Sequence, residues 1–157
     1  MRREILVYPD PFLARKAAPV AAVNDRIRTL IRDMFETMYS AEGIGLAATQ
    51  VGVGKRVVVL DVSPVDETIA PLAVVNPEIV SRSGSVTGVE GCLSVPGVQG
   101  EVCRAETVEV HGMDAQGDPL RIRAAGILSR ALQHEIDHLD GVLFIDRLSS
   151  SVAASAK

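Results

Sequence analysis

Apolar residues recur every three or four positions in two stretches of the chain, which is the spacing of one face of an α-helix. The first stretch covers residues 25–40 and follows Asn24, a residue type that favours helix N-termini. The second covers residues 127–139 and is followed by Gly141, which suits the left-handed position just after a helix. The pattern therefore predicts two amphipathic helices, with the apolar face of the first packed in the core.

Shorter apolar runs have the composition of β-strands. Residues 56–62 and 72–80 are rich in valine and predict buried strands, the second with an interruption at Asn76 and Pro77. A further short strand is predicted at residues 5–7, before a proline-rich turn.

Alternating apolar and polar residues predict a β-hairpin before the second helix. Its strands are residues 107–111 and 120–123, joined by turn-forming residues 114–118. Strands come first, hairpins replace regular βαβ units, and the second helix comes late. This order favours an α+β fold with antiparallel sheets packed around a central helix. We expect a single catalytic domain over residues 1–148 and a flexible tail over residues 149–157, which are rich in serine and alanine.

Two glycine-rich segments separate these elements. Residues 42–52 predict an open backbone that a ligand can approach closely. They suit a peptide-like ligand better than a phosphate, because the Gly-Lys-Ser/Thr ending of a phosphate-binding loop is missing. Residues 88–97 predict a loop that carries Cys92. Reactive groups are common on such loops, and a buried structural thiol is the alternative for Cys92.

The composition narrows the classes of protein that fit the chain. Apolar residues make up 47% and aromatic residues 3%, so the core must be built from aliphatic side chains. A net charge of -4 without a long basic run argues against binding to nucleic acid. Two cysteines make no disulfide framework, no apolar run approaches the ~18 residues that span a membrane, and the first residues lack a signal-peptide pattern. These features predict a soluble cytoplasmic protein.

The chemistry most strongly indicated lies in the second predicted helix. His134 and His138 are one helical turn apart, so both imidazoles face one side and can bind one metal ion. Glu135 flanks that position and can take a proton from a metal-bound water. The spacing leaves the third ligand open, because Phe144 stands where many metalloproteases have a third histidine. The remaining candidates are Cys92, Cys103, His111, Asp137, Asp140 and Asp146.

Three separated segments, residues 43–50, 90–94 and 133–138, resemble in order the three signature motifs of the peptide deformylases. Residues 8–11 and 141–144 also resemble that family, so the similarity spans nearly the whole chain. The resemblance implies a hydrolase that removes the N-formyl group from the initiator methionine of new polypeptides and releases formate. Its expected partners are N-formylmethionyl nascent chains, with transient proximity to the ribosome, in a bacterial-type cytoplasm.

The resemblance also implies a metal site. It assigns Cys92, His134 and His138 as ligands of one divalent metal ion, with a water in the fourth position. Fe(II) is the expected native metal, and zinc, nickel or cobalt are expected substitutes. Glu135 is then the general acid and base for attack by metal hydroxide.

Further residues receive roles from the same resemblance. The Gln50 side-chain amide and the Leu93 backbone N–H are expected to donate hydrogen bonds to the developing oxyanion. The residues expected to bind the substrate line its backbone path or an apolar methionine pocket; they are Gly43, Ile44, Gly45, Ile127 and Ala131. Charge and proximity to the motifs suggest candidates for orienting the histidines and the motif loops, which are Glu42, Glu90 and Arg104.

The chain departs from commoner members of that family at several positions. Val89 stands where many members have a glutamate, and Cys103 where proline is frequent. The chain ends soon after the second helix, where many bacterial members have a longer basic helix. Ribosome docking that depends on such a helix is therefore in doubt, and we expect residues 151–157 to be dispensable for deformylation of peptides.

Two other functions remain as alternatives at this point. A zinc metallopeptidase fits His-Glu-x-x-His, but the missing downstream ligand and the glycine-rich first motif count against it. A non-catalytic metal-binding protein fits the ligands alone. Under that alternative, Glu135 and Gln50 would have no reason to accompany a structural metal site.

Overall fold

The secondary structure comprises two α-helices and seven strands among residues 1–148, which are the residues that the computed structural model describes. The helices are α1 (Asp25–Ser40) and α2 (Gly126–Leu139), with short 3-10 helices η1 (Pro11–Ala14), η2 (Ala48–Val51) and η3 (Phe144–Arg147). The strands are β1 (Gly45–Ala47), β2 (Val57–Leu60), β3 (Leu72–Ser83), β4 (Val86–Cys92), β5 (Val95–Arg104), β6 (Thr107–Met113) and β7 (Pro119–Ala125).

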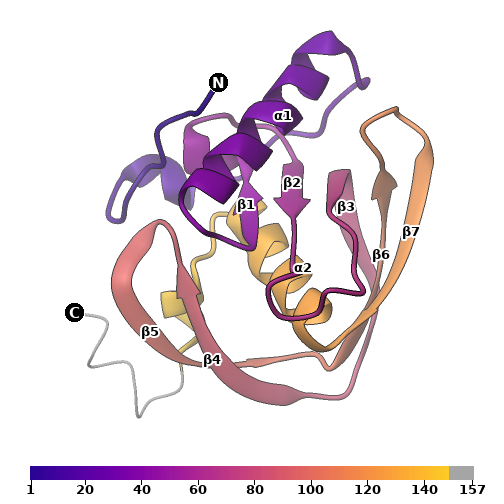
Figure 1. Cartoon of the computed structure of the whole chain (residues 1–157). Helices are drawn as coiled ribbons and strands as arrows, with labels where there is room; N and C mark the ends of the chain where they lie inside the picture. Colours follow the sequence, from indigo (N-terminus) through magenta and orange to yellow (C-terminus); the bar gives the residue numbers. More distant parts are fainter. Residues whose placement is uncertain (149–157) are drawn as a thin grey trace.

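Two antiparallel sheets frame the molecule (Figure 1). One has five strands in the order β1-β2-β3-β6-β7, and the other consists of β4 and β5. The hairpin predicted at residues 107–111 and 120–123 is present as β6 and β7. The α+β class with antiparallel sheets around a central helix, α2, is confirmed.

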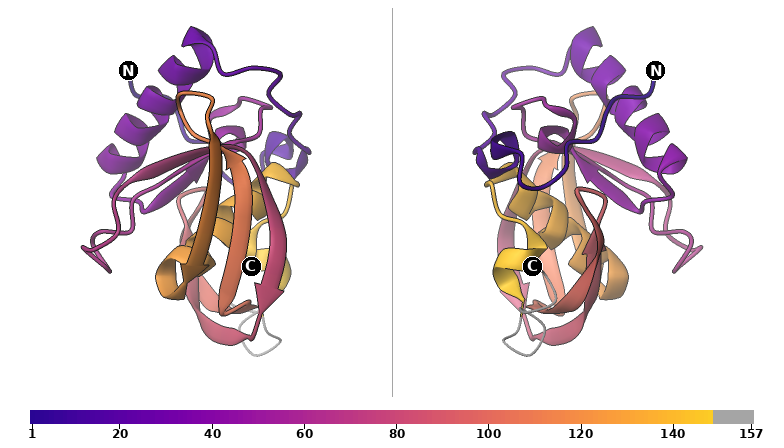
Figure 2. Two further views of the ribbon diagram at one scale, coloured as in Figure 1. Left: turned by 90° about the vertical axis from the view of Figure 1, so that its right-hand side faces the viewer. Right: turned by 90° about the vertical axis from the view of Figure 1, so that its left-hand side faces the viewer.

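Strand β2 is buried on both faces because α1 and α2 lie on opposite sides of the five-stranded sheet (Figure 2). Val57 and Val59 belong to the core under α1, whereas Val58 and Leu60 belong to the core under α2. Successive side chains of a strand point to opposite faces, so one run of apolar residues supplies two cores. The prediction of a buried strand within residues 56–62 is confirmed.

Both predicted helices are present where the periodicity places them. Asn24 precedes α1, and its side-chain oxygen accepts a hydrogen bond from the N–H of Ile27 at 3.1 Å, which satisfies one of the free donors of the first turn. Beyond α2, Gly141 has a φ of 77°, as expected for the left-handed position after a helix. A Cβ at this glycine would also overlap the carbonyl group of Ala14.

The strand predicted at residues 5–7 is wrong. The chain there forms no ladder and is held by isolated backbone hydrogen bonds. The N–H of Leu6 donates to the carbonyl of Gln50 at 2.7 Å, and the N–H of Tyr8 donates to the carbonyl of Ser94 at 2.8 Å.

Strand β3 continues through the predicted interruption. Asn76 has a φ of 53°, and the register with β6 shifts between Val75 and Glu78, so the strand passes Pro77 by a bulge. The Asn76 side chain holds the bulge, because it accepts a hydrogen bond from the Val20 N–H at 2.8 Å and donates one to the Val20 carbonyl at 2.9 Å.

Cys92 is the last residue of β4, and the loop predicted over residues 88–97 is wrong. β4 and β5 pair up to Cys92, so only Leu93 and Ser94 form the turn. The glycines of this segment lie inside the paired strands, as Gly88 does. Gly88 is closely packed, since a Cβ there would lie 3.2 Å from Cζ of Arg130, whereas Gly97 has a φ of 79°, which favours glycine.

The glycine-rich segment at residues 42–52 contains β1 and η2, and β1 is an edge strand of the five-stranded sheet. None of the helices within residues 1–148 has both the length and the apolar character needed to cross a membrane. The predicted flexible tail (149–157) and the expected dispensability of residues 151–157 concern residues outside the described part of the chain.

Candidate metal centre

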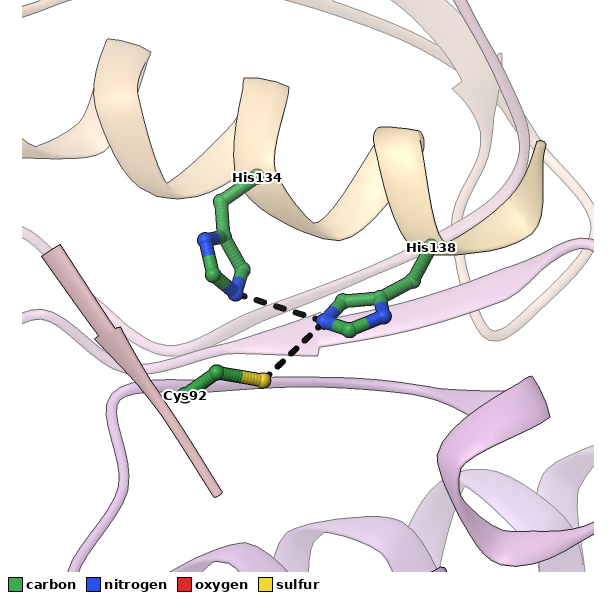
Figure 3. A group of neighbouring side chains, drawn as sticks. All are labelled: Cys92, His134 and His138. Atoms are coloured by element: carbon green, nitrogen blue, oxygen red, sulfur yellow. Dashed lines mark hydrogen bonds between the residues drawn. The ribbon is translucent and has the colours of Figure 1, made fainter. Parts of the chain in front are cut away.

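His134 and His138 lie one turn apart on the face of α2 that is turned toward the end of β4 (Figure 3). Their Nε2 atoms are 3.3 Å apart, and Sγ of Cys92 lies 3.3 Å from Nε2 of His138. The three ligand atoms all lie within 4.8 Å of one another. The fold thus brings together one thiol and two imidazoles from segments that are distant in the sequence.

The donor set and its spacing fit a divalent metal ion. In a tetrahedral zinc site, two nitrogen ligands are about 3.3 Å apart and a sulfur and a nitrogen about 3.6 Å apart, which is close to the 3.3 Å separations of this cluster. His138 is fully buried, and burial holds its pKa well below the usual value, so its ring is neutral and can offer a lone pair. Its Nδ1 has no hydrogen-bond partner among the described residues.

The surroundings of His134 also favour positive charge. Burial opposes protonation of its ring, but the charge of Glu135, a hydrogen bond with Cys92 and another with Glu90 outweigh it and raise the pKa of His134 to about 10. A site that holds a proton so tightly has the negative potential that a metal cation requires.

The other candidates for a third ligand lie elsewhere. Cys103 is exposed on β5, and His111 is bound to Glu109 at 2.7 Å in the five-stranded sheet. Three aspartates are engaged by arginines or a backbone N–H; they are Asp137, Asp140 and Asp146. Among residues 1–148, Cys92 is therefore the candidate that completes the cluster.

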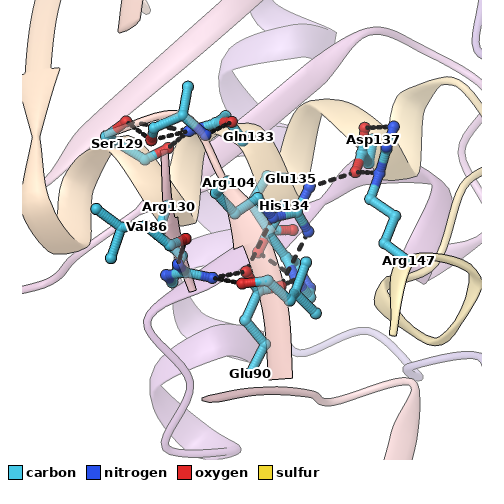
Figure 4. Close-up of polar contacts among 12 residues, drawn as sticks. Val86, Glu90, Arg104, Ser129, Arg130, Gln133, His134, Glu135, Asp137 and Arg147 are labelled. Carbon is cyan, nitrogen blue, oxygen red and sulfur yellow. Dashed lines mark hydrogen bonds and ion pairs between the residues drawn. The ribbon is translucent and has the colours of Figure 1, made fainter. Parts of the chain in front are cut away.

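Glu90 orients His134 from behind the cluster (Figure 4). Its carboxylate receives a hydrogen bond from Nδ1 of His134 at 2.9 Å and a bidentate pair from Arg104 at 2.9 Å. Burial opposes ionisation of Glu90, but these hydrogen bonds outweigh it and hold the pKa of Glu90 well below its usual range. Because a carboxylate only accepts, Nδ1 of His134 carries the proton and Nε2 is left for the cluster.

The Glu135 side chain is buried beside the cluster, with Oε2 4.0 Å from Nε2 of His134. Its Oε1 has no hydrogen-bond partner among the described residues. Burial raises the pKa of Glu135 to about 7, so the carboxyl group can both take up and release a proton near neutral pH. Strand β1 passes very close, since a Cβ at Gly45 would lie 2.5 Å from Oε2.

Gln50 is fixed with its amide group toward Cys92. Its Oε1 accepts a hydrogen bond from the N–H of Ala47 at 2.9 Å, which forces Nε2 to the opposite side. Nε2 lies 3.0 Å from Oγ of Ser94 and 3.6 Å from Sγ of Cys92. The Ser94 N–H also donates to Sγ at 3.4 Å.

A cleft of about 670 Å³ opens beside these groups. Among the residues that line it are the five predicted substrate-binding residues, Gly43, Ile44, Gly45, Ile127 and Ala131. The expected catalytic residues line the same cleft, namely Gln50, Leu93 and Glu135. Every predicted site residue except His138 thus lines this cleft, and Nε2 of His138 lies 3.3 Å from Nε2 of His134.

Sequence reasoning misses two residues of this site. Ser94 lies inside the second motif, but nothing in its spacing shows that it joins Gln50 to Cys92. Arg130 has only the weak signal of a charged residue one turn before His134. Glu42, a candidate for orienting the histidines or the motif loops, lines the cleft and has a φ of 59°.

The chain is similar to known proteins over nearly its whole length. A family model described as polypeptide deformylase matches residues 2–154. The chain is 56% identical to a peptide deformylase of Alkalilimnicola ehrlichii over 93% of this chain and 82% of the relative. It is 51% identical to one from Picosynechococcus over 98% of this chain and 83% of that protein.

Solved structures give the same result. A peptide deformylase from Legionella pneumophila superposes with a TM-score of 0.92 at 46% identity, covering 99% of this chain and 91% of the other. One from Synechococcus elongatus in complex with actinonin superposes with a TM-score of 0.90 at 46% identity, covering 94% and 81%. The chain belongs to the polypeptide deformylase family.

Proposed function

We propose that Cys92, His134 and His138 hold one divalent metal ion and that Glu135 moves the protons during deformylation. As a member of its family, the chain is a metal-dependent hydrolase that removes the N-formyl group from newly made polypeptides. The observation that carries the residue assignment is the thiol–imidazole cluster directly beside the buried carboxyl group of Glu135.

The metal ion that Cys92, His134 and His138 would hold supplies chemistry that these side chains lack. When bound, it contributes positive charge that makes hydroxide available near neutral pH and polarises the formyl carbonyl. One thiolate and two imidazoles suit a borderline first-row ion. We assign Fe(II) as the native ion, with zinc, nickel or cobalt as substitutes.

Glu135 carries the proton through the reaction. Its carboxylate takes a proton from the attacking water, whose oxygen adds to the formyl carbon. The bond between that carbon and the amine nitrogen then breaks, and Glu135 returns the proton to the amine. Formate and a free N-terminal amine leave. The pKa of about 7 that burial gives Glu135 supports both steps.

Gln50 and Leu93 stabilise the negative charge that develops on the formyl oxygen. The orientation of Gln50, set by the Ala47 N–H, makes its Nε2 a pre-positioned donor. The Leu93 N–H lies in the two-residue turn next to Cys92. One such donor lowers a barrier of this kind by ~3 kcal/mol.

The substrate occupies the cleft. Its backbone runs along Gly43, Ile44 and Gly45, where β1 is an edge strand of the five-stranded sheet. Its methionine side chain packs against Ile44, Ile127 and Ala131. The natural partners are N-formylmethionyl nascent chains, which place the enzyme transiently near the ribosome in a bacterial-type cytoplasm.

Formate release from a formyl-Met tripeptide tests the proposal. The protein is purified without oxygen and assayed with the formyl peptide and with its acetyl analogue. We expect rapid release of formate and little release of acetate. Loss of activity in air would indicate Fe(II), and activity that survives air would indicate zinc, nickel or another stable ion.

Glu135→Gln separates the enzyme from a protein that merely binds metal. The variant should keep one metal ion per chain, because all three ligands remain, and lose at least ~100-fold in kcat, because proton transfer by a positioned group is worth that much. Metal content and kcat are both measured. An unchanged kcat would contradict the role of Glu135 in proton transfer. A wild type that binds metal but shows no turnover would revive the non-catalytic alternative, and cleavage of an unformylated internal peptide bond would revive the metallopeptidase.

A further inference from the structure

The proposed metal ligands come from two separate parts of the fold. His134 and His138 lie on α2, whereas Cys92 lies at the tip of the β4–β5 hairpin (Val86–Arg104). This hairpin forms its own two-stranded sheet and shares no strand pairing with the five-stranded sheet. The distance between the thiol and the imidazoles therefore depends on side chains that join the hairpin to α2.

Arg130 joins α2 to both strands of the hairpin (Figure 4). Its NH1 donates to Oε2 of Glu90 at 2.6 Å and to the carbonyl of Val102 at 3.0 Å. Its NH2 donates to the carbonyl of Val86 at 2.8 Å. The guanidinium also lies against Gly88, where a Cβ would be 3.2 Å from its Cζ atom.

Arg104 makes the reciprocal connection. It comes from β5, forms the bidentate pair with Glu90, and donates to Oδ2 of Asp137 on α2 at 2.6 Å. Arg104 reaches the helix from the hairpin, and Arg130 reaches the hairpin from the helix. Both arginines meet at Glu90, whose carboxylate also receives Nδ1 of His134.

The geometry points to Arg130 as a positioning residue that sets the separation of Cys92 from the two histidines and thereby retains the metal. This inference rests on the proposed metal site. Arg130 fastens the strand that carries Cys92 and, through Glu90, the ring of His134. Its planar fork uses NH1 for the carboxylate and the Val102 carbonyl and NH2 for the Val86 carbonyl, a two-nitrogen geometry that a lysine side chain does not offer.

Release of zinc from the loaded enzyme tests the role of Arg130. Wild type and Arg130→Met are loaded with zinc, and the rate of metal loss to an excess of chelator is followed. We expect Arg130→Met to lose zinc about tenfold faster, because groups that orient metal ligands typically contribute that much to metal binding. A cobalt-loaded sample should show an altered visible spectrum, because the ligand geometry changes.

Arg56→Met is the matched control. The Arg56 side chain is 15% exposed, against 14% for Arg130, and it binds the other end of α2 through the Leu139 carbonyl and Asp140 without touching the hairpin. It should lower stability comparably and change zinc release by less than about threefold. Should Arg130→Met fail to fold by circular dichroism, Arg130→Lys carries the test with the same criterion.

The outcomes separate this inference from the proposed function. Zinc loss more than about threefold faster in the Arg130 variant, and not in Arg56→Met, supports the inference. An unchanged rate, an equal effect of Arg56→Met, or a raised KM with normal zinc retention overturns it. If wild type binds no zinc and releases no formate, the proposed function fails and the inference fails with it.

Discussion

Gly45 is the single residue that most directly limits where the catalytic carboxyl group can lie. A side chain there would meet Oε2 of Glu135 at 2.5 Å, a separation at which one of the two must move. Glu135 is itself buried on α2 and β1 is buried throughout, so neither can shift without disturbing its neighbours.

Gly45→Ala should therefore damage catalysis more than metal binding. Displacement of Glu135 by about 1 Å is expected to lower kcat about 100-fold, with metal content unchanged. Gly54→Ala is the control, since the nearest atom to a Cβ there is Cζ of Phe12 at 3.9 Å. Measuring kcat and bound metal for both variants checks this. A kcat for Gly45→Ala within about threefold of wild type would contradict it.

At the residue scale, the sequence predicts contacts within one helix and misses those between elements. The shared face of His134 and His138 follows from the helical period alone. Cys92 reaches the two histidines through the pairing of strands that are distant from α2 in the sequence. Residue spacing therefore leaves the third ligand open, and only the family resemblance assigns it. Ser94 and Arg130 act through contacts that no local pattern records.

At the scale of elements, a partly buried hydrogen bond between side chains joins α1 to the residue that follows β2. The Tyr39 hydroxyl donates to Oδ2 of Asp61 at 2.6 Å. Burial and this bond to a carboxylate raise the pKa of Tyr39 to about 12, and the same bond lowers the pKa of Asp61. Each group therefore contributes to stability over a different range of pH.

The contribution of Tyr39 should disappear in alkali. Its folded pKa lies above the unfolded value of about 10, so the contribution is complete below about pH 10 and is lost as pH rises toward 12. Tyr39→Phe should lower the free energy of unfolding at pH 8. Between pH 10 and pH 12 the variant should lose less of this free energy than wild type does. Denaturant unfolding across this range checks it, with Tyr8→Phe, the other tyrosine, as control. Parallel loss in wild type and Tyr39→Phe would argue against the link.

Element types follow from periodicity, but element partners do not. Helices α1 and α2 are predicted correctly because their patterns are long and regular. Residues 5–7 have strand-like composition but form no ladder. The glycines of residues 88–97 suggest a loop, but they lie in paired strands, where Gly88 packs closely beside Arg130. Local composition cannot distinguish these cases, because the deciding neighbour lies on another element.

At the scale of the whole molecule, β2 joins the core under α1 to the core under α2. It pairs with β1 on one side and β3 on the other, and its side chains alternate between the two cores. Neither core can open while β2 stays in place, so both should unfold together. The β4–β5 hairpin lacks such a connection and is expected to open more readily.

Amide hydrogen exchange should show greater protection in β2 than in the β4–β5 hairpin. The amides of Val58 and Val59 are expected to exchange only through global unfolding, with protection equal to the denaturant-derived free energy. Amides of the hairpin that pair β4 with β5 should exchange faster, through local opening. Native-state exchange followed by mass spectrometry or NMR measures both. Equal protection in the hairpin and in β2 would contradict the separation.

The close approach of Gly45 and Glu135 also affects which residues related sequences can carry at these two positions. The first and third motifs are distant in the sequence, yet a Cβ at Gly45 would overlap Oε2 of Glu135. Substitutions at these two positions are therefore expected to be coupled in evolution. A lineage that abandons the acidic side chain of Glu135 is released from the demand for glycine at position 45, and larger residues can then accumulate there. Glycine at position 45 in a related sequence therefore indicates that the carboxylate at position 135 is retained.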